Sequence, residues 1–527
     1  MLVGGVKSGA LSLLFFTSIS LSVCAQVDAD AVKFSKYINV KSAREHLKII
    51  ASDDFEGRET GTRGAQKAAD YLAAEMKKIG LDAPVNGSFF QQVELSRRVL
   101  TVNNFQVEGL DLLNLKDFYM RAAATVNVTG STLVFAGYGI GTDSYDDLKG
   151  QDLSGKVVLM ISRGEPRKDG VSLISGSAAD SEWSRLINKR VDYIQSKGPS
   201  LILAVNPGLS SALKNNKDLL SSSRISINRN VPDAATPGAP VIQLTPEAAD
   251  LFLKHSGNTL EKLENKINET GKPVSQVIPA DFRISLKAES EKVSAVNVMG
   301  YLEGSDLRDE LVVISAHYDH LGLNANGKDK VFNGADDDGS GTTAVLELAE
   351  AFNKAKKAGK GPRRSILFLF VVGEEKGLLG SEWYSEHPVF PLKNTVTDLN
   401  IDMIGRVDPG HKKEPDYCYL VGSDKLSSDL HRISESANST YTKLTLDYKY
   451  NAPNDPEQIY FRSDHYNFAK HNIPVIFYFN GVHGDYHQPG DEVKKILFPL
   501  LVKRAQLVFF TAWDLVNREG RPVVDVK

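Results

Sequence analysis

Residue types that bind divalent metals follow several apolar runs in the second half of this chain. Imidazole and carboxylate side chains are the ligands that zinc prefers. In chain order, Leu311–Ala316 precedes His317, Ser365–Val372 precedes Glu374 and Glu375, Leu399–Ile401 precedes Asp402, and Ile473–Phe479 precedes His487. An acidic, glycine-rich turn that contains Asp337 lies between the first two runs. Because functional groups in open α/β sheets collect at the carboxyl ends of strands, we expect these side chains to meet in one site.

Each of these residues also has a simpler interpretation. A lone histidine after a strand is more often a satisfied polar residue than a ligand, and the Glu374–Glu375 pair could be solvated. The run Asp336–Asp338 could only favour the start of the next helix through its macrodipole. The joint occurrence of these residue types at successive strand ends nevertheless favours a metal centre. Nothing in the pattern makes ligands of three further histidines, which we expect to be structural or substrate-proximal: His320, His465 and His483.

Charge balance suggests a separate role for one carboxylate. Two divalent ions would be neutralised by three ligand carboxylates and one bridging hydroxide. One member of the Glu374–Glu375 pair is then spare. Glu374 can therefore act as a base rather than a ligand.

The apolar runs predict the fold class. They are nearly continuous, as expected for strands that are buried on both faces of a largely parallel sheet. A helical pattern at 64–81 precedes these runs, and another at 342–354 separates the first two of them. This alternation predicts an α/β fold with a mixed, mostly parallel sheet sandwiched by helices. The charged, turn-rich stretch Asp53–Gly64 reads as a loop, either a solvated connection or the rim of a cleft.

The middle of the chain has a different pattern. Short β-rich runs separated by turn clusters appear at 131–136, 156–161, 200–205 and 240–244. They predict a smaller, β-rich unit inserted into the main fold. The resulting division is a signal peptide at 1–25, an N-terminal part of the main domain at 26–122, the insert at 123–272 and the rest of the main domain at 273–527.

The first residues have the pattern of a targeting segment. Lys7 precedes the apolar stretch Leu11–Val23, and small residues follow it up to Ala25. This pattern predicts a cleaved secretory signal and an exported, periplasmic or extracellular protein. The alternative is lipid anchoring through Cys24, which is disfavoured by the bulky Val23. No later run of about 18 apolar residues predicts a transmembrane anchor.

Composition excludes several classes of protein. The chain has 527 residues with 42% hydrophobic and 24% charged residues, which is typical of globular proteins. Its 62 Lys and Arg against 66 Asp and Glu give a formal charge of −4, so no basic footprint predicts nucleic-acid binding. Cys24 and Cys418 are the only cysteines, so intrachain disulfides do not hold the fold.

Together, several motifs resemble the co-catalytic di-zinc aminopeptidase family, metallopeptidase family M28. FEGRETGTRG (Phe55–Gly64) is also typical of that family. The matching segments are SAHYDHLG (Ser315–Gly322), NGADDDGSGTTAVLELA (Asn333–Ala349), VVGEEKGLLGS (Val371–Ser381), LNIDMIG (Leu399–Gly405), RSDHYNFA (Arg462–Ala469) and YHQPGD (Tyr486–Asp491).

The resemblance implies a role for each site residue. Two zinc ions would share Asp337, with His317 and Asp402 completing one site and Glu375 and His487 the other. Glu374 would be the general base, Tyr486 a candidate oxyanion donor, and Asp319 the partner of the second imidazole nitrogen of His317. In this family the peptide bond after the bridging aspartate is often cis. The segment from Ala123 to about Lys272 resembles a protease-associated insert, which would be either a spacer or a lid.

The implied activity is hydrolysis of N-terminal residues from peptides with a free N-terminus. Three alternatives remain: a glutaminyl cyclase-like enzyme with one zinc ion, a glutamate carboxypeptidase-like exopeptidase, and a non-catalytic binding protein on the same fold. The sequence leaves open the preferred N-terminal residue and the oligomeric state.

Overall fold

The computed structural model describes residues 27–121, 124–215, 224–228, 238–324 and 327–526. The predicted signal peptide, including Cys24, lies outside these residues. Within the described ranges, no helix combines the length and apolar character that crossing a membrane requires.

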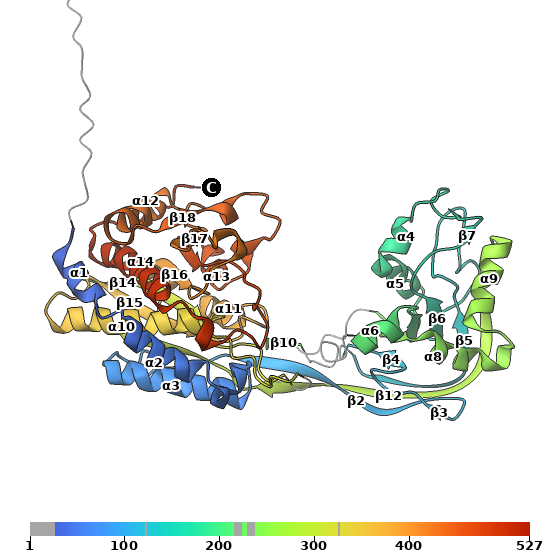
Figure 1. The fold of residues 1–527 in the computed structure, drawn as a ribbon. Helices are drawn as coiled ribbons and strands as arrows, with labels where there is room; N and C mark the ends of the chain where they lie inside the picture. Colours follow the sequence, from blue (N-terminus) through green and yellow to red (C-terminus); the bar gives the residue numbers. More distant parts are fainter. Residues whose placement is uncertain (1–26, 122–123, 216–223, 229–237, 325–326, 527) are drawn as a thin grey trace, which may run out of the picture.

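An eight-stranded mixed sheet carries the predicted site (Figure 1). Its strands lie in the order β1-β13-β15-β14-β16-β19-β17-β18. The four central strands, β15, β14, β16 and β19, are parallel to one another, whereas β13 and β17 pair with them in the antiparallel sense. The bounds are β1 Phe90–Gln92, β13 Val296–Leu302, β14 Leu307–His317, β15 Arg364–Val371, β16 Thr395–Ile401, β17 Tyr417–Val421, β18 Thr445–Asp447 and β19 Val475–Phe479.

Helices cover both faces of this sheet. Alternate residues of β15 enter two different hydrophobic clusters, because successive side chains of a strand point to opposite faces. Phe368 belongs to a cluster that includes residues of helices α1, α2, α3, α10 and α14, and Leu367 belongs to one that includes residues of α11 and α13. The predicted α/β sandwich is therefore confirmed. The helices are α1 Ala29–Ser35, α2 Val40–Ile50, α3 Arg63–Ile79, α10 Gly339–Lys357, α11 Leu379–Glu386, α12 Ser428–Ala437, α13 His465–Ala469 and α14 Phe498–Asn517.

A nine-stranded sheet forms a second unit with its own core. Its main path is β10-β2-β12-β5-β6-β9-β11-β4, and β3 pairs with β2. Helices α8 and α9 pack on one face and α5 on the other. The bounds are β2 Leu95–Val107, β3 Leu110–Asp111, β4 Phe118–Tyr119, β5 Val126–Phe135, β6 Val157–Ile161, β9 Leu201–Val205, β10 Ile225–Ile227, β11 Val241–Leu244, β12 Gln276–Val293, α4 Glu182–Arg185, α5 Ile187–Gln195, α6 Leu209–Asn215, α8 Pro246–Leu253 and α9 Leu260–Thr270, with a separate hairpin of β7 Arg167–Lys168 and β8 Val171–Ser172.

The nine-stranded sheet extends beyond the predicted insert. Strand β2 begins at Leu95 and β12 ends at Val293, so the sheet reaches past the expected limits of 123 and 272 on both sides. These two strands pair along most of their length and form the ribbon that joins the two units (Figure 1). The division into domains stays a prediction, with the limits of the insert moved outward.

Candidate metal centre

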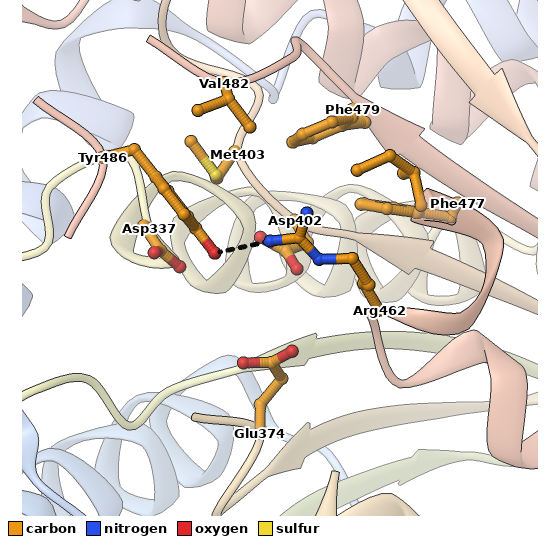
Figure 2. A pocket seen from close by; sticks show the side chains of 10 residues that line it. Asp337, Glu374, Asp402, Met403, Arg462, Phe477, Phe479, Val482 and Tyr486 are labelled. Atoms are coloured by element: carbon orange, nitrogen blue, oxygen red, sulfur yellow. Dashed lines mark hydrogen bonds between the residues drawn. The ribbon is translucent and has the colours of Figure 1, made fainter. Parts of the chain in front are cut away.

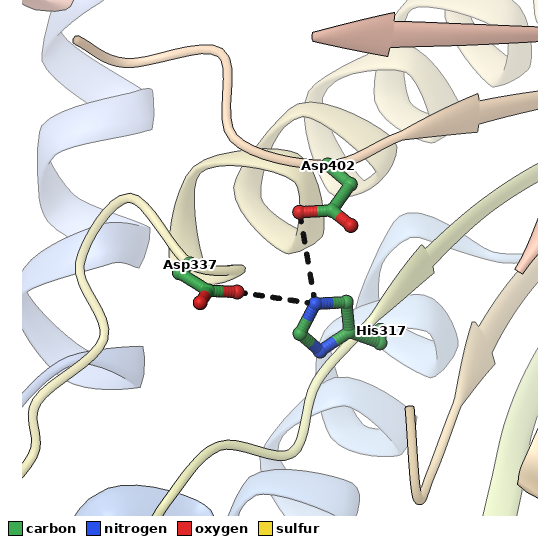
Figure 3. A group of neighbouring side chains, drawn as sticks. All are labelled: His317, Asp337 and Asp402. Carbon is green, nitrogen blue, oxygen red and sulfur yellow. Dashed lines mark ion pairs between the residues drawn. The ribbon is translucent and has the colours of Figure 1, made fainter. Parts of the chain in front are cut away.

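Three predicted ligands converge at the carboxyl ends of the parallel strands (Figure 3). His317 is the last residue of β14, Asp402 directly follows β16, and Asp337 lies in the turn before α10. The Nε2 atom of His317 lies 3.3 Å from Asp337 Oδ1 and 3.7 Å from Asp402 Oδ1. All three residues are buried. They form one group of potential ligands.

A second group shares Asp337. The Nε2 atom of His487 lies 3.1 Å from both Asp337 Oδ2 and Glu375 Oε2. His320 also approaches this group, with its Nδ1 atom 2.8 Å from Glu375 Oε1 and 3.8 Å from Asp337 Oδ2. The two oxygens of Asp337 therefore face different groups, as a bridging carboxylate requires.

His320 is the residue of this centre that the sequence interpretation left out as a ligand. Ligand atoms of His320, Asp337 and Glu375 all lie within 4.8 Å of one another. The available signal was its place in the HYDH motif, three residues after His317. His487 remains the better placed of the two imidazoles, because it is equally close to both carboxylates.

The donor atoms fit divalent cations. Buried polar atoms without a hydrogen-bond partner cost free energy and are rare in folded proteins. Here such atoms cluster, and imidazole with carboxylate is a donor set that suits zinc. They are His317 Nε2, both ring nitrogens of His320, Asp337 Oδ2 and Glu375 Oε1.

The pKa values of two acidic residues in the centre are shifted in opposite directions. Burial disfavours the charged form of Asp337, but the neighbouring imidazoles of His317 and His487 outweigh it and hold the pKa of Asp337 well below its usual range. For Glu374, burial raises the pKa well above its usual range, and the neighbouring charges of Glu375 and Asp402 add to this effect. Two carboxyl groups with opposite tendencies suit different roles, one as a charged ligand and one as a group that accepts and returns a proton.

Glu374 lies on the wall of a cavity beside the ligands (Figure 2). Its Oε2 atom is 3.9 Å from His317 Nε2, and it points toward Asp337 and Asp402 from the end of a different strand. The same cavity contains Tyr486 and Arg462 and has an apolar part formed by Met403, Ile459, Phe477, Phe479 and Val482.

Asp319 acts on His317 through its backbone. The Nδ1 atom of His317 lies 3.0 Å from the carbonyl oxygen of Asp319 and 3.8 Å from its carboxylate. A proton on Nδ1 leaves Nε2 as the ligand atom, and such outer partners fix the orientation of a metal-binding imidazole. The carboxylate of Asp319 instead accepts a hydrogen bond from the backbone N–H of Glu374, at 3.2 Å. The expected contact thus involves the carbonyl group, and the carboxylate positions Glu374.

Tyr486 borders both the cavity and the second group of ligands. Its ring stacks on His487 with 3.8 Å between centroids, and its hydroxyl accepts a 3.3 Å hydrogen bond from Arg462. Burial raises the pKa of Tyr486, with a further contribution from Asp337, so the hydroxyl keeps its proton and is able to donate it in a hydrogen bond.

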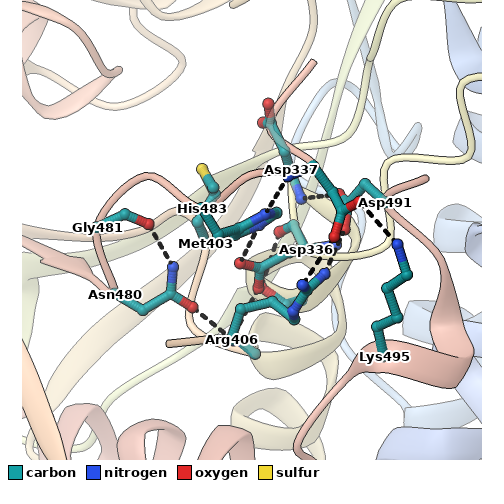
Figure 4. Close-up of polar contacts among 12 residues, drawn as sticks. Asp336, Asp337, Met403, Arg406, Asn480, Gly481, His483, Asp491 and Lys495 are labelled. Carbon is teal, nitrogen blue, oxygen red and sulfur yellow. Dashed lines mark hydrogen bonds and ion pairs between the residues drawn. The ribbon is translucent and has the colours of Figure 1, made fainter. Parts of the chain in front are cut away.

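The turn around Asp337 is held from behind (Figure 4). Oδ2 of Asp491 accepts hydrogen bonds from the N–H groups of Asp336 and Asp337 at 2.9 and 3.0 Å. Asp336 in turn lies 3.1 Å from Nε2 of His483, which is therefore a structural histidine. The peptide bond between Asp337 and Asp338 is cis, as the resemblance implied.

Two other residues have structural contacts. Ser463 donates a 2.8 Å hydrogen bond to Oδ2 of Asp402, which leaves Oδ1 facing His317. His465 is fully buried and stacks on Phe477. Burial lowers the pKa of His465 to about 3, so it is neutral.

The fold and the site define a class of protein. An α/β sandwich that gathers two groups of imidazole and carboxylate ligands around one shared aspartate is typical of a metal-dependent hydrolase. Residues 297–511 of the chain match the model of peptidase family M28.

Curated relatives carry peptidase names. A probable leucine aminopeptidase from Arthroderma otae is 31% identical over 213 residues, which cover 39% of this chain and 54% of the relative. Aminopeptidase YwaD from Bacillus subtilis is 25% identical over 265 residues, covering 48% and 51%. A probable glutamate carboxypeptidase from Arthroderma benhamiae is 37% identical over 108 residues, covering 20% and 14%. The chain thus matches only about half the length of the aminopeptidases.

Solved structures share the fold over nearly the whole chain. An aminopeptidase from Aneurinibacillus sp. strain AM-1 aligns over 94% of this chain and 98% of its own, with a TM-score of 0.52 and 17% identity. The zinc aminopeptidase BSAP from Bacillus subtilis aligns over 93% and 99%, with a TM-score of 0.50 and 20% identity. At this level of identity the likeness shows the fold alone.

Proposed function

We propose that this chain is a zinc-dependent aminopeptidase that removes N-terminal residues from peptides. One observation carries the proposal: two groups of ligands share Asp337, and Glu374 lies beside them on the wall of the same cavity. The aminopeptidase names of the relatives support the same activity.

In this proposal each zinc ion has its own ligands. His317 and Asp402 would hold one ion, Glu375 and His487 would hold the other, and Asp337 would contribute to both. When bound, such a pair of ions acts as a Lewis acid that lowers the pKa of water and stabilises negative charge on the reacting carbonyl oxygen.

The side chains of this protein move the protons. Glu374 takes a proton from the attacking water and returns it to the leaving amine, as its position on the cavity wall allows. Asp319 keeps Glu374 in place through the backbone hydrogen bond at 3.2 Å. The hydroxyl of Tyr486 donates a hydrogen bond to the developing oxyanion, a role that its raised pKa supports.

The lining of the cavity supports a substrate with a free N-terminus. Asp337, Glu374 and Asp402 line one part of it, where the free α-amino group of a substrate would lie beside the metal site. Met403, Phe477 and Phe479 line the other part and would accept an apolar side chain. We therefore propose peptides with a free N-terminus as the substrates, and either a spacer or a lid as the role of the nine-stranded unit.

A substrate panel tests the activity. Peptides with a free N-terminus and their N-blocked counterparts should be assayed with and without a chelator. Chelator-sensitive cleavage of the free peptides alone supports the proposal. Release of C-terminal glutamate would indicate the glutamate carboxypeptidase-like alternative, and cyclisation of N-terminal glutamine would indicate the glutaminyl cyclase-like one. No turnover together with no zinc binding would leave a binding protein.

Export is a separate part of the proposal. It rests on the sequence pattern of Met1–Ala25. Cell fractionation with N-terminal sequencing of the mature protein tests it: a start at Gln26 supports cleavage, and a lipid on Cys24 would indicate anchoring.

A further inference from the structure

We infer that residues 57–60, which lie far outside the segment 297–511, position the metal centre. We call this segment, Gly57-Arg58-Glu59-Thr60, the N-terminal clamp. The inference rests on the proposed function only in that the centre binds zinc. The turn-rich stretch that contains the clamp was expected to be a loop at the surface or at the rim of a cleft. Arg58 and Thr60 are instead buried, at 0% and 2% exposure.

Arg58 ties together the two loops that present metal ligands. Its Nε donates a 2.8 Å hydrogen bond to the carbonyl of Tyr318, the residue between His317 and Asp319. Its terminal nitrogens donate to the carbonyls of Asn333 and Gly334, at 2.7 and 3.0 Å, where the turn toward Asp337 begins. One rigid guanidinium therefore fixes the distance between the loops of His317 and Asp337.

A further contact ties Arg58 to the end of α2, through a 2.8 Å hydrogen bond to the carbonyl of Ile50. The hydrogen bonds of the Arg58 guanidinium to Tyr318, Ile50, Asn333 and Gly334 all go to backbone carbonyls. Burial lowers the pKa of Arg58 only to about 10, so the group remains charged at neutral pH. It is thus a buried cation that is committed to backbone carbonyls.

Thr60 positions the proposed base. Its hydroxyl donates a 2.6 Å hydrogen bond to Oδ2 of Asp319. The other oxygen of Asp319 accepts the hydrogen bond from the N–H group of Glu374. Thr60 therefore holds the carboxylate that holds Glu374.

The backbone of the clamp follows the loop after His317. The carbonyl groups of Gly57 and Arg58 accept hydrogen bonds from the N–H groups of Gly322 and His320, at 2.9 and 3.2 Å. Three successive residues, Glu56, Gly57 and Arg58, have positive φ values of 52°, 66° and 52°. Non-glycine residues rarely adopt this conformation, so tertiary contacts, rather than local preference, hold the segment against the centre.

The insert offers a matched control. Arg190 is another fully buried arginine, and it donates to backbone carbonyls of Trp183, Ile161 and Gly164. Replacement of Arg190 removes a comparable buried guanidinium that is distant in sequence from every proposed ligand. Loss of stability alone would affect Arg58 and Arg190 variants alike, whereas a positioning role affects only the Arg58 variant.

The experiment measures zinc affinity by competition with a chromogenic chelator on the full chain, with circular dichroism as the folding control. The variants are Arg58→Met, Thr60→Val, Thr60→Ser and Arg190→Met. Loss of outer partners of metal ligands typically weakens binding about 10- to 100-fold. We expect at least about tenfold weaker zinc binding in Arg58→Met, a smaller loss in Thr60→Val, recovery in Thr60→Ser, and wild-type affinity in Arg190→Met.

The outcomes separate this inference from the proposed function. Wild-type affinity in both folded Arg58→Met and Thr60→Val would overturn the inference and leave the proposed function intact. If Arg58→Met does not fold, Thr60→Val and Thr60→Ser decide: equal affinity in these two variants would overturn it. A wild-type chain that binds no zinc would overturn the proposed function itself.

Discussion

The two sheets of this protein contain similar strands that end in different ways. Strands β6 and β9 of the insert are buried throughout, as are β15 and β16 of the main sheet. After β6, the hydroxyl of Ser162 bonds to the carbonyl of Val205, and after β9, Asn206 bonds to Gln243. After the main strands, imidazole and carboxylate atoms face one another without hydrogen-bond partners. Buried parallel strands are therefore common to both units. The site is distinguished by side-chain atoms at the strand ends that lack hydrogen-bond partners.

Buried charges show the same contrast. Asp147 in the insert accepts hydrogen bonds from the N–H groups of Tyr138 and Ile140 and from the hydroxyl of Tyr145. Among the described residues of the nine-stranded unit, Asn104 Oδ1 is the one buried side-chain atom without a partner. The carboxyl group of Asp147 is thus satisfied within the fold, whereas a cluster of imidazole and carboxylate atoms without hydrogen-bond partners suits a metal site.

The largest expected effect is on the shared aspartate. Asp337→Ala should lose both zinc ions, because both groups of ligands depend on this residue. Elemental analysis of the folded variant measures this. Asp147→Ala is the control from the insert and should lower the melting temperature while keeping zinc. Retention of two zinc equivalents in Asp337→Ala would contradict the proposal that Asp337 is a ligand of both ions.

Replacement of the proposed base should affect turnover alone. Glu374→Gln keeps the shape of the side chain but cannot accept the proton, so kcat should fall by at least about 10²-fold with zinc content unchanged. Steady-state kinetics on a free-amine peptide, together with metal analysis, check this prediction. Turnover near the wild-type value would exclude Glu374 as the base.

The two histidines near Glu375 can be ranked. His487 Nε2 lies 3.1 Å from both carboxylates of the second group, whereas His320 Nδ1 lies 2.8 Å from Glu375 but 3.8 Å from Asp337. We expect His487→Ala to weaken zinc binding by more than the about 10- to 100-fold that is typical of losing an outer partner, and His320→Ala to weaken it less. Calorimetric zinc titration of both variants measures the order. The reverse order would assign the second site to His320.

The smallest effect is expected from the tyrosine. Tyr486→Phe removes the hydroxyl that we propose for the oxyanion and keeps the ring that stacks on His487. We expect kcat to fall about tenfold with little change in KM. Unchanged kcat would leave Tyr486 with a packing role.

The sequence predicted the elements that are continuous along the chain. The runs before His317, Glu374 and Asp402 are strands of the main sheet, because their apolar character is local and strong. The limits of the insert were not predictable in this way. Strand β2 is stabilised by pairing with β12, whose residues lie far away in the sequence.

Residue type and spacing alone did not distinguish the three adjacent aspartates, among which the family resemblance singled out Asp337. Asp336 contacts His483, Asp337 faces the ligands, and Asp338 caps helix α10 through the N–H of Gly341. Three adjacent aspartates have the same chemistry, and only the turn geometry separates them. Burial of Arg58 was equally hidden, because its partners are backbone carbonyls, which every residue has.

The most direct test of the account is anomalous diffraction at the zinc edge from crystals of the zinc-loaded protein. We expect two zinc peaks on either side of Asp337, roughly 3.5–4 Å apart. One should lie within bonding distance of His317 and Asp402, and the other within bonding distance of Glu375 and His487. A single peak, or zinc bound away from Asp337, would contradict it.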